Sequence, residues 1–459
     1  MENKSDNNQM IRVPIKERIC YFFSDFGHQG VMWNFVNTYI LFFFTDILGI
    51  SPAAAGVLLL VVTIFDALND PIIGWLCDRT RSKMGTYRPY IIASAIPMGL
   101  LTFLCFVAPD FTGGGKLAYA YIVYTLFTVA GTFSGCAFGA LPAVMTNDPQ
   151  QRVVLGTFRD YGANAGGFIL NLVATTLLLF FSRNAEVITA GGLRTMGLLV
   201  GCWVCVCLLI CGIGCKERIV PADEPVNLGK ALKSLLHNRP AICLILLVVC
   251  VNCFLAFKGA LTVFYCEHYL GNMKLMTPIM TLMFTTPLLG LLFVPKVVSL
   301  LGKKKMFMLS GIFAVLSGLL LLIAQKNVVM ICIASLSCGL VVSGVFATIW
   351  GTMPDAADYG EWKTGVYCPG VITAMATFAC KLGSGIAQYG VAMVLDITGY
   401  DPALAVQSAS TVNAIYWSTG LIPIILGGLA IICILPYNLT SEKMVEINAA
   451  LAERRAKAE

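Results

Sequence analysis

The sequence predicts an all-α polytopic membrane protein in which twelve transmembrane helices form two pseudo-symmetric six-helix bundles. The first observation is composition: 58% of the 459 residues are hydrophobic and only 12% are charged, outside the range of soluble globular proteins. The second is that apolar runs of about 20 residues, the length that spans a bilayer, recur along almost the whole chain. The third is a long polar stretch, residues 216–239, that divides these runs six and six.

The spans follow one another with short connections. Hydropathy places them at residues 19–45, 52–77, 89–108, 117–145, 154–182, 190–215, 240–266, 276–300, 305–325, 328–352, 367–396 and 413–436. An even number of spans puts both termini on one side. The loops that carry Arg79, Arg152 and Lys303 fall on that side, and the opposite loops are poor in Lys and Arg. Because cytoplasmic loops are enriched in these residues, we expect both termini in the cytoplasm of a bacterial cell, and the spans in lipid of its cytoplasmic membrane.

The polar stretch defines the predicted domains. Residues 1–215 form an N-terminal bundle that carries the cation site, residues 216–239 a cytoplasmic linker, and residues 240–459 a C-terminal bundle with a cytoplasmic tail. In the linker, an apolar face predicts a short amphipathic surface helix; it consists of Leu228, Leu232, Leu235 and Leu236. Two similar halves are typical of secondary transporters that bind solute at mid-membrane depth and work by alternating access.

The span 52–77 contains three oxygen-bearing side chains on one helical face. Asp66, Asn69 and Asp70 stand at positions i, i+3 and i+4, about 6 Å apart. A charged side chain at mid-membrane depth costs roughly 2.5–3.5 kcal/mol, so two on one helix indicate an aqueous cavity or a bound cation. Either Na⁺ or a proton relieves the repulsion between the carboxylates. The alternative interpretation is a helix-packing pair satisfied by basic neighbours.

Polar side chains in other spans predict the lining of a solute cavity, since such groups rarely face lipid. Those assigned to solute binding are Asp25, His28, Gln29, Asn34, Arg159, Lys258 and Lys381. Arg159 and Lys381 are the strongest candidates, because a buried cation requires a partner or a substrate. A single amide such as Asn34 is more often an interhelical hydrogen bond than a ligand.

The segment GWLCDRTRSKMG, residues 74–85, joins the second and third spans and resembles the G-x-x-x-D-R/K-x-G-R/K-R/K loop of major facilitator proteins. Gly74, Asp78, Arg79 and Lys83 fit that pattern, whereas Arg81 stands at its inner glycine and Ser82 at a cation. We expect a charged hinge in which Asp78, Arg79 and Arg81 take part in gating. The alternative is a topology signal only.

Four runs, FDALNDPIIGW, TRSKMGTYRPY, DAADYGEWKTG and CKLGSGIAQYG, resemble the glycoside-pentoside-hexuronide cation symporters over nearly the whole chain. The resemblance implies a major facilitator fold and sugar uptake driven by Na⁺, Li⁺ or H⁺. It assigns cation binding to Asp66, Asn69, Asp70 and Thr132, with Na⁺ held by the two carboxylates. It also relates Arg159 and Lys381 to a cationic pair that supports the sugar site.

The resemblance is incomplete at the sugar site. Two carboxylates that bind a galactoside in the family fall at Gln29 and Gly135, a lysine falls at His28, and a stacking tryptophan falls near Gly139. Losing two carboxylates removes strong hydrogen bonds to hydroxyls and leaves the cations in excess. This balance predicts an acidic sugar such as a hexuronide, while neutral pentosides stay open.

The predicted function is therefore cation-coupled symport of a sugar or glycoside, with a non-sugar organic anion as the alternative cargo. An enzyme is not expected, because His28, His237 and His268 fall on separate segments without metal-ligand spacing. A channel is disfavoured by the six-plus-six pattern. The expected partners are a small solute, a monovalent cation and lipid; no cofactor, nucleic acid or second subunit is expected.

Overall fold

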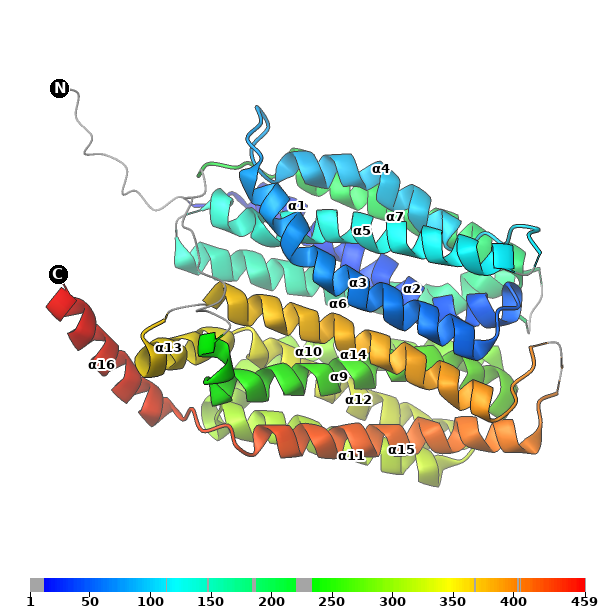
Figure 1. Cartoon of the computed structure of the whole chain (residues 1–459). Helices are drawn as coiled ribbons and strands as arrows, with labels where there is room; N and C mark the ends of the chain where they lie inside the picture. Colours follow the sequence, from blue (N-terminus) through cyan, green and yellow to red (C-terminus); the bar gives the residue numbers. More distant parts are fainter. Residues whose placement is uncertain are drawn as a thin grey trace. The chain divides into compact units, whose positions relative to one another are not determined.

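The structure, a computed structural model, describes residues 12–112, 114–146, 148–183, 187–219, 233–366, 369–402, 404 and 406–458. These residues form long helices joined by short connections (Figure 1). The chain folds as two compact units: Met1–Phe43 with Phe65–Asp223, and Phe44–Ile64 with Glu224–Glu459. The predicted bundles 1–215 and 240–459 differ from this division at residues 44–64, which pack with the second unit.

The first unit begins with a continuous helical rod from Ile15 to Ile47, whose last residues belong to the second unit. The rod consists of α1 (Ile15–Asp25), η1 (Phe26–Trp33), α2 (Asn34–Phe42) and η2 (Phe43–Ile47). Both η segments are π-helical, and such widened turns are common at functional sites. The other helices are α3 (Pro52–Arg79), α4 (Arg88–Leu104), α5 (Gly114–Met145), α6 (Pro149–Phe181) and α7 (Ala190–Gly214).

Small residues bring the helices of this unit together. A Cβ on Gly201 of α7 would lie 2.3 Å from the carbonyl oxygen of Gly99 on α4. A Cβ on Gly166 of α6 would lie 2.5 Å from the carbonyl oxygen of Phe26 on η1. Lipid tails are as apolar as leucine, so close backbone packing replaces the hydrophobic effect in holding membrane helices together.

The second unit contains the remaining helices around one apolar core. They are α9 (Arg239–Phe264), η3 (Tyr265–Tyr269), η4 (Met273–Leu275), α10 (Met276–Leu301), α11 (Lys303–Ala324), α12 (Val328–Ile349), α13 (Met353–Thr364), α14 (Pro369–Ile397), α15 (Ala409–Ile434) and α16 (Ser441–Ala458). Phe307, Val345 and Tyr437 are fully buried in this core.

Two of these helices, α13 and α16, were not expected. Ile447 and Leu451 of α16 stand at i and i+4 and are buried in the core of the second unit, and α16 packs on α13. Both helices are too polar to cross a bilayer, and α13 is also too short, so a hydropathy window passes over them.

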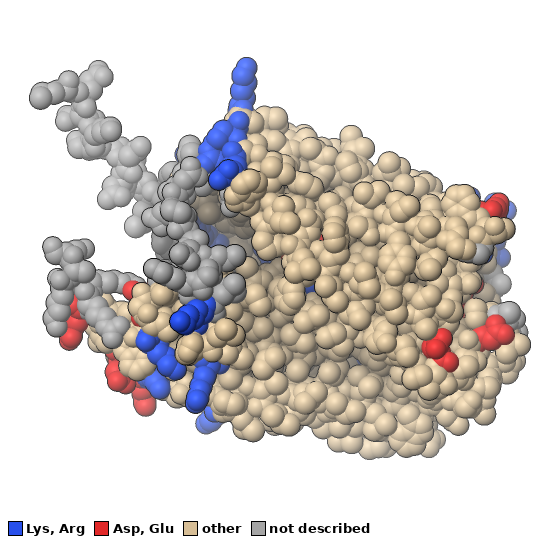
Figure 2. Space-filling model, in the orientation of Figure 1, with Lys and Arg blue, Asp and Glu red and all other residues tan. Residues whose placement is uncertain are grey.

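The predicted spans coincide with helices, which confirms an all-α polytopic membrane protein. Of the described helices, nine are long and apolar enough to cross a membrane. Phe180 and Ile323 expose 73% and 67% of their surface, as lipid-facing residues do. On the face shown in Figure 2, the charged side chains lie mainly at the helix ends. The predicted linker helix falls mostly outside the described residues; Leu235 is buried and Leu236 is exposed.

Candidate cation and solute site

The carboxylates of α3 meet a hydroxyl of α5. Thr132 Oγ1 lies 2.7 Å from Asp66 Oδ1 and 3.1 Å from Asp70 Oδ1. Asp66 and Thr132 are 3% and 4% exposed, and Asn69 is half-buried on the same helix. The proline that follows, Pro71, has no N–H to donate to the carbonyl of Ala67, one turn back in α3. The structure thus brings Asp66, Asp70 and Thr132 together, and their oxygens suit a hard cation or a proton.

The half-buried arginine of α6, Arg159, has an acidic partner. Arg159 Nε lies 2.7 Å from Asp25 Oδ2 at the end of α1, and their side chains are 34% and 8% exposed. Close packing of the two helices makes this possible, since a Cβ on Gly162 would lie 2.3 Å from the carbonyl oxygen of Phe22. Asp160 adds a second carboxylate next to Arg159 along the chain. The sequence alone suggests that Arg159 is a cation without a balancing carboxylate, whereas the structure pairs it with Asp25.

His28 lies in an aromatic setting that the sequence reasoning missed. Its ring centroid is 5.1 Å from that of Phe138 and 6.3 Å from that of Trp33, and the residue is 5% exposed. A Cβ on Gly135 would lie 3.8 Å from His28 Cε1, an ordinary contact, so the glycine leaves room beside the imidazole. The tryptophan five residues after His28 was the available signal, because aromatic faces commonly accompany polar groups in ligand pockets.

The two amides of the first helical rod differ. Gln29 is exposed, whereas Nδ2 of Asn34 is buried with no hydrogen-bond acceptor among the described residues. A buried donor without a partner is costly in a low-dielectric interior. Asn34 is therefore the amide better placed to donate to a bound solute.

The second unit contains two predicted solute-binding lysines. Lys258, in the last third of α9, is 3% exposed, and no described residue forms an ion pair or hydrogen bond with its ammonium. Its own carbonyl accepts a 2.6 Å hydrogen bond from Thr262 Oγ1. Lys381, on α14, is half-buried. Lys258 is the more unusual, because charged lysines are almost never fully buried unless paired.

The predicted gating loop is tied to the end of α7. Carboxylate oxygens of Glu217 accept hydrogen bonds from the backbone N–H groups of Thr86, Tyr87 and Arg88, at 2.6, 2.8 and 2.8 Å. Arg88 Nε donates to the carbonyl of Gly212 at 2.8 Å. Gly85, with φ +114°, makes the turn, and a side chain there would meet Glu217.

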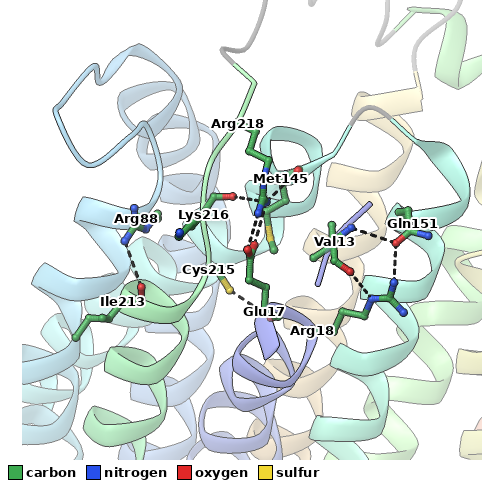
Figure 3. A network of polar contacts seen from close by, with 10 residues as sticks. All are labelled: Val13, Glu17, Arg18, Arg88, Met145, Gln151, Ile213, Cys215, Lys216 and Arg218. Carbon is green, nitrogen blue, oxygen red and sulfur yellow. Dashed lines mark hydrogen bonds and ion pairs between the residues drawn. The ribbon is translucent and has the colours of Figure 1, made fainter. Parts of the chain in front are cut away.

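A neighbouring ion pair joins the segment that follows α7 to α1 (Figure 3). Arg218 forms a two-pronged contact with Glu17, 2.9 Å from Nη1 to Oε2. The predicted gating residues make local contacts: Arg79 lies over the ring of Trp75 at 4.3 Å, and Arg81 donates to the carbonyl of Thr80. The side chain of Asp78 lies outside the described residues. Sequence reasoning missed Glu17, Glu217 and Arg218, which lie far from the loop in the chain.

Known proteins resemble the chain over almost its whole length. The family described as MFS/sugar transport protein matches residues 20–441. The Uncharacterized symporter YnaJ of Bacillus subtilis (strain 168) is 32% identical over 96% of both chains. The Isoprimeverose transporter of Lactiplantibacillus pentosus is 30% identical over 93% of this chain and 89% of its own. A bacterial homolog of the human lysosomal transporter Spinster, solved inward-facing, shares the fold: TM-score 0.63, 13% identity, covering 93% of this chain and 98% of that one.

Proposed function

The chain belongs to the MFS/sugar transport protein family, and from this premise we propose that it couples uptake of an acidic sugar or glycoside to an inward Na⁺ gradient. The family membership confirms the resemblance to glycoside-pentoside-hexuronide cation symporters. The protein is thus a multi-pass transporter of a small solute and a coupling cation, not an enzyme. We also propose that both termini are cytoplasmic, which the Lys- and Arg-rich loops support, and that the protein works as a monomer.

The contact of Thr132 with both carboxylates of α3 is the observation that carries the cation assignment. A pair of carboxylates in a low-dielectric site repels itself, and one bound cation removes that repulsion. Sodium is preferred to a proton because Asn69 and Thr132 add neutral oxygens, which a proton does not need. Cation binding and solute binding then strengthen each other by the same factor.

The solute assignment depends on which of the proposed cavity cations has a neighbouring carboxylate to balance its charge. Asp25 compensates Arg159, so Arg159 leaves no excess positive charge in the first unit, and the Asn34 amide and the His28–Trp33 aromatic pair are the groups proposed to contact a sugar ring. Lys258 has no described counter-ion, and an anionic group on the solute would provide one. A hexuronide offers Lys258 such a group, whereas a neutral pentoside does not.

Transport by purified protein in proteoliposomes tests the proposal. Uptake of a radiolabelled glucuronide is measured under an imposed Na⁺ gradient, an imposed pH gradient, and neither, with isoprimeverose as the neutral competitor. We expect concentrative uptake under the Na⁺ gradient alone, lost in Asp66→Asn and Asp70→Asn. Accumulation driven only by the pH gradient would overturn the sodium assignment, and uptake of isoprimeverose in preference to the glucuronide would overturn the acidic cargo.

A further inference from the structure

The segment Phe44–Ile64 packs with the second unit although the chain joins it to the first unit at both ends. Part of this packing is apolar and close. A Cβ on Gly56 would lie 2.5 Å from Cβ of Ala392, and one on Gly385 would lie 2.9 Å from Cγ2 of Thr63. The first half of α3 therefore touches α14 through small residues, and these contacts do not depend on pH.

The other part of this packing is a chain of hydrogen bonds near the N-terminal end of the segment Phe44–Ile64. The hydroxyl of Tyr400 contacts Oδ1 of Asp46, and Nε2 of His268 lies 3.0 Å from that hydroxyl. Thr45 Oγ1 donates to Oδ2 of Asp46 at 2.6 Å. Tyr400 is 6% exposed and packs edge-on against Phe264. We call Asp46, Tyr400 and His268 the Asp46 chain.

This chain stays hydrogen-bonded in both protonation states of Asp46. When the carboxylate is charged, Tyr400 donates to it and accepts from Nε2–H of His268. When the carboxyl is protonated, it donates to Tyr400, whose hydroxyl then donates to an unprotonated Nε2, with the His268 proton on Nδ1. No group loses its partner, so the proton alone decides how much buried charge the contact contains.

Other titratable groups face the same place. Glu267, next to His268, has a buried oxygen, Oε2, without a donor among the described residues, and its carboxylate and that of Asp46 repel each other. Asp401 adds negative charge beside Tyr400, while Lys326 lies 5.4 Å from the ring centroid of Tyr269. The surroundings of Asp46 are thus mainly acidic, which opposes a second buried negative charge.

We propose that the Asp46 chain is a proton-operated latch: a proton on Asp46 holds the segment Phe44–Ile64 on the second unit, and loss of that proton loosens it. The latch lies at the membrane face predicted to be outside, so the external pH would act on it. Its use in a transport cycle rests on the proposed function, whereas the pH dependence of the contact does not.

The size of the effect follows from linkage. Burial raises the pKa of Asp46, which lies just beyond the predicted span 19–45, to about 6. A solvated aspartate titrates near pH 3.9, so the closed contact binds the proton more tightly than the open one. Closure is therefore favoured by acid, and the advantage is lost as pH rises through about 6. For the proton on Asp46 by itself, the closed-to-open ratio should rise about tenfold between pH 8 and pH 5.

Peptide-resolved hydrogen exchange on the purified full-length protein, without solute or gradient, tests the latch. Protection of backbone amides at residues 44–51 and 395–402, corrected for intrinsic exchange, is compared at pH 5 and pH 8. We expect about tenfold more protection at pH 5 in the wild type. Asp46→Asn, which mimics the protonated carboxyl, should lose that tenfold difference between the two pH values.

Three variants control the interpretation. Tyr400→Phe should lower protection at both pH values, and Gly56→Leu should do so without touching a titratable group. Asp110→Asn changes an exposed acid of the first unit and should keep the wild-type response. A tenfold response that persists in Asp46→Asn, or a wild type with equal protection at both pH values, would overturn the latch. Either result leaves the proposed transport function intact, because no solute is present.

Discussion

The hydroxyl of Thr132 lies 2.7 Å from Oδ1 of Asp66, and both residues are almost completely buried. The contact joins α5 to α3, so a second helix fixes the carboxylate. Thr132 is also within 3.1 Å of Asp70, but its single hydroxyl hydrogen serves one carboxylate at a time. A shared neutral donor offsets less negative charge than a cation does, which is the physical reason to expect a cation at this place.

Replacing Thr132 by valine should weaken Na⁺ binding without changing the size of the side chain. Hydrogen bonds to charged groups are worth about 1.5–3 kcal/mol, so the dissociation constant should rise at least tenfold. The measurement is the Na⁺ concentration that raises the thermal unfolding temperature of the purified protein, since a bound ligand stabilises the folded state. Thr132→Ser keeps the hydroxyl and should bind Na⁺ like the wild type; equal affinities for the Val and Ser variants would remove Thr132 from the site.

The shared face of the three polar residues of α3 could be predicted from the sequence, whereas the partners of several proposed solute-site residues could not. Asp66, Asn69 and Asp70 share one helix, where spacing alone fixes the face that they occupy. The pairing of Arg159 with Asp25 depends on how closely α1 and α6 approach, which Gly162 permits and which no local pattern reveals. The same applies to Glu217, whose partners lie about 130 residues earlier in the chain.

Asp25→Asn should leave Arg159 as an uncompensated, partly buried cation. We expect a loss of about 1–3 kcal/mol in the free energy of unfolding, less than for a fully buried pair because Arg159 is 34% exposed. The double variant Asp25→Asn/Arg159→Gln should recover part of that loss, because it removes the stranded charge. Unfolding in detergent, followed for both single variants and the double one, gives the coupling energy; strictly additive losses would mean that the ion pair contributes nothing.

Glu217→Gln should release the loop between α3 and α4 from the segment that follows α7. The carboxylate accepts three backbone N–H groups at the start of α4, where the helix dipole also favours a negative charge. An amide oxygen accepts more weakly, so the free energy of unfolding should fall by about 1–2 kcal/mol. Hydrogen exchange at residues 84–90 should rise in this variant and stay unchanged in Glu446→Gln, an exposed glutamate of α16. Unchanged protection in both variants would show that the three hydrogen bonds do not hold the loop.

Lys258→Met should show whether the buried ammonium only lowers the stability of the fold or also binds an anionic group of the solute. Methionine has a similar length and no charge, so the variant removes an ammonium that no described residue pairs. Because burying an unpaired charge is costly, we expect the free energy of unfolding to rise by about 1–3 kcal/mol. If the ammonium binds the anionic group of the solute, the same variant should lose at least tenfold in affinity for a glucuronide, and inhibition by a neutral glycoside should not change. Lys274→Met, at an exposed lysine of the same unit, is the matched control and should change neither quantity. A more stable Lys258→Met protein that still transports the glucuronide with wild-type affinity would place Lys258 outside the solute site.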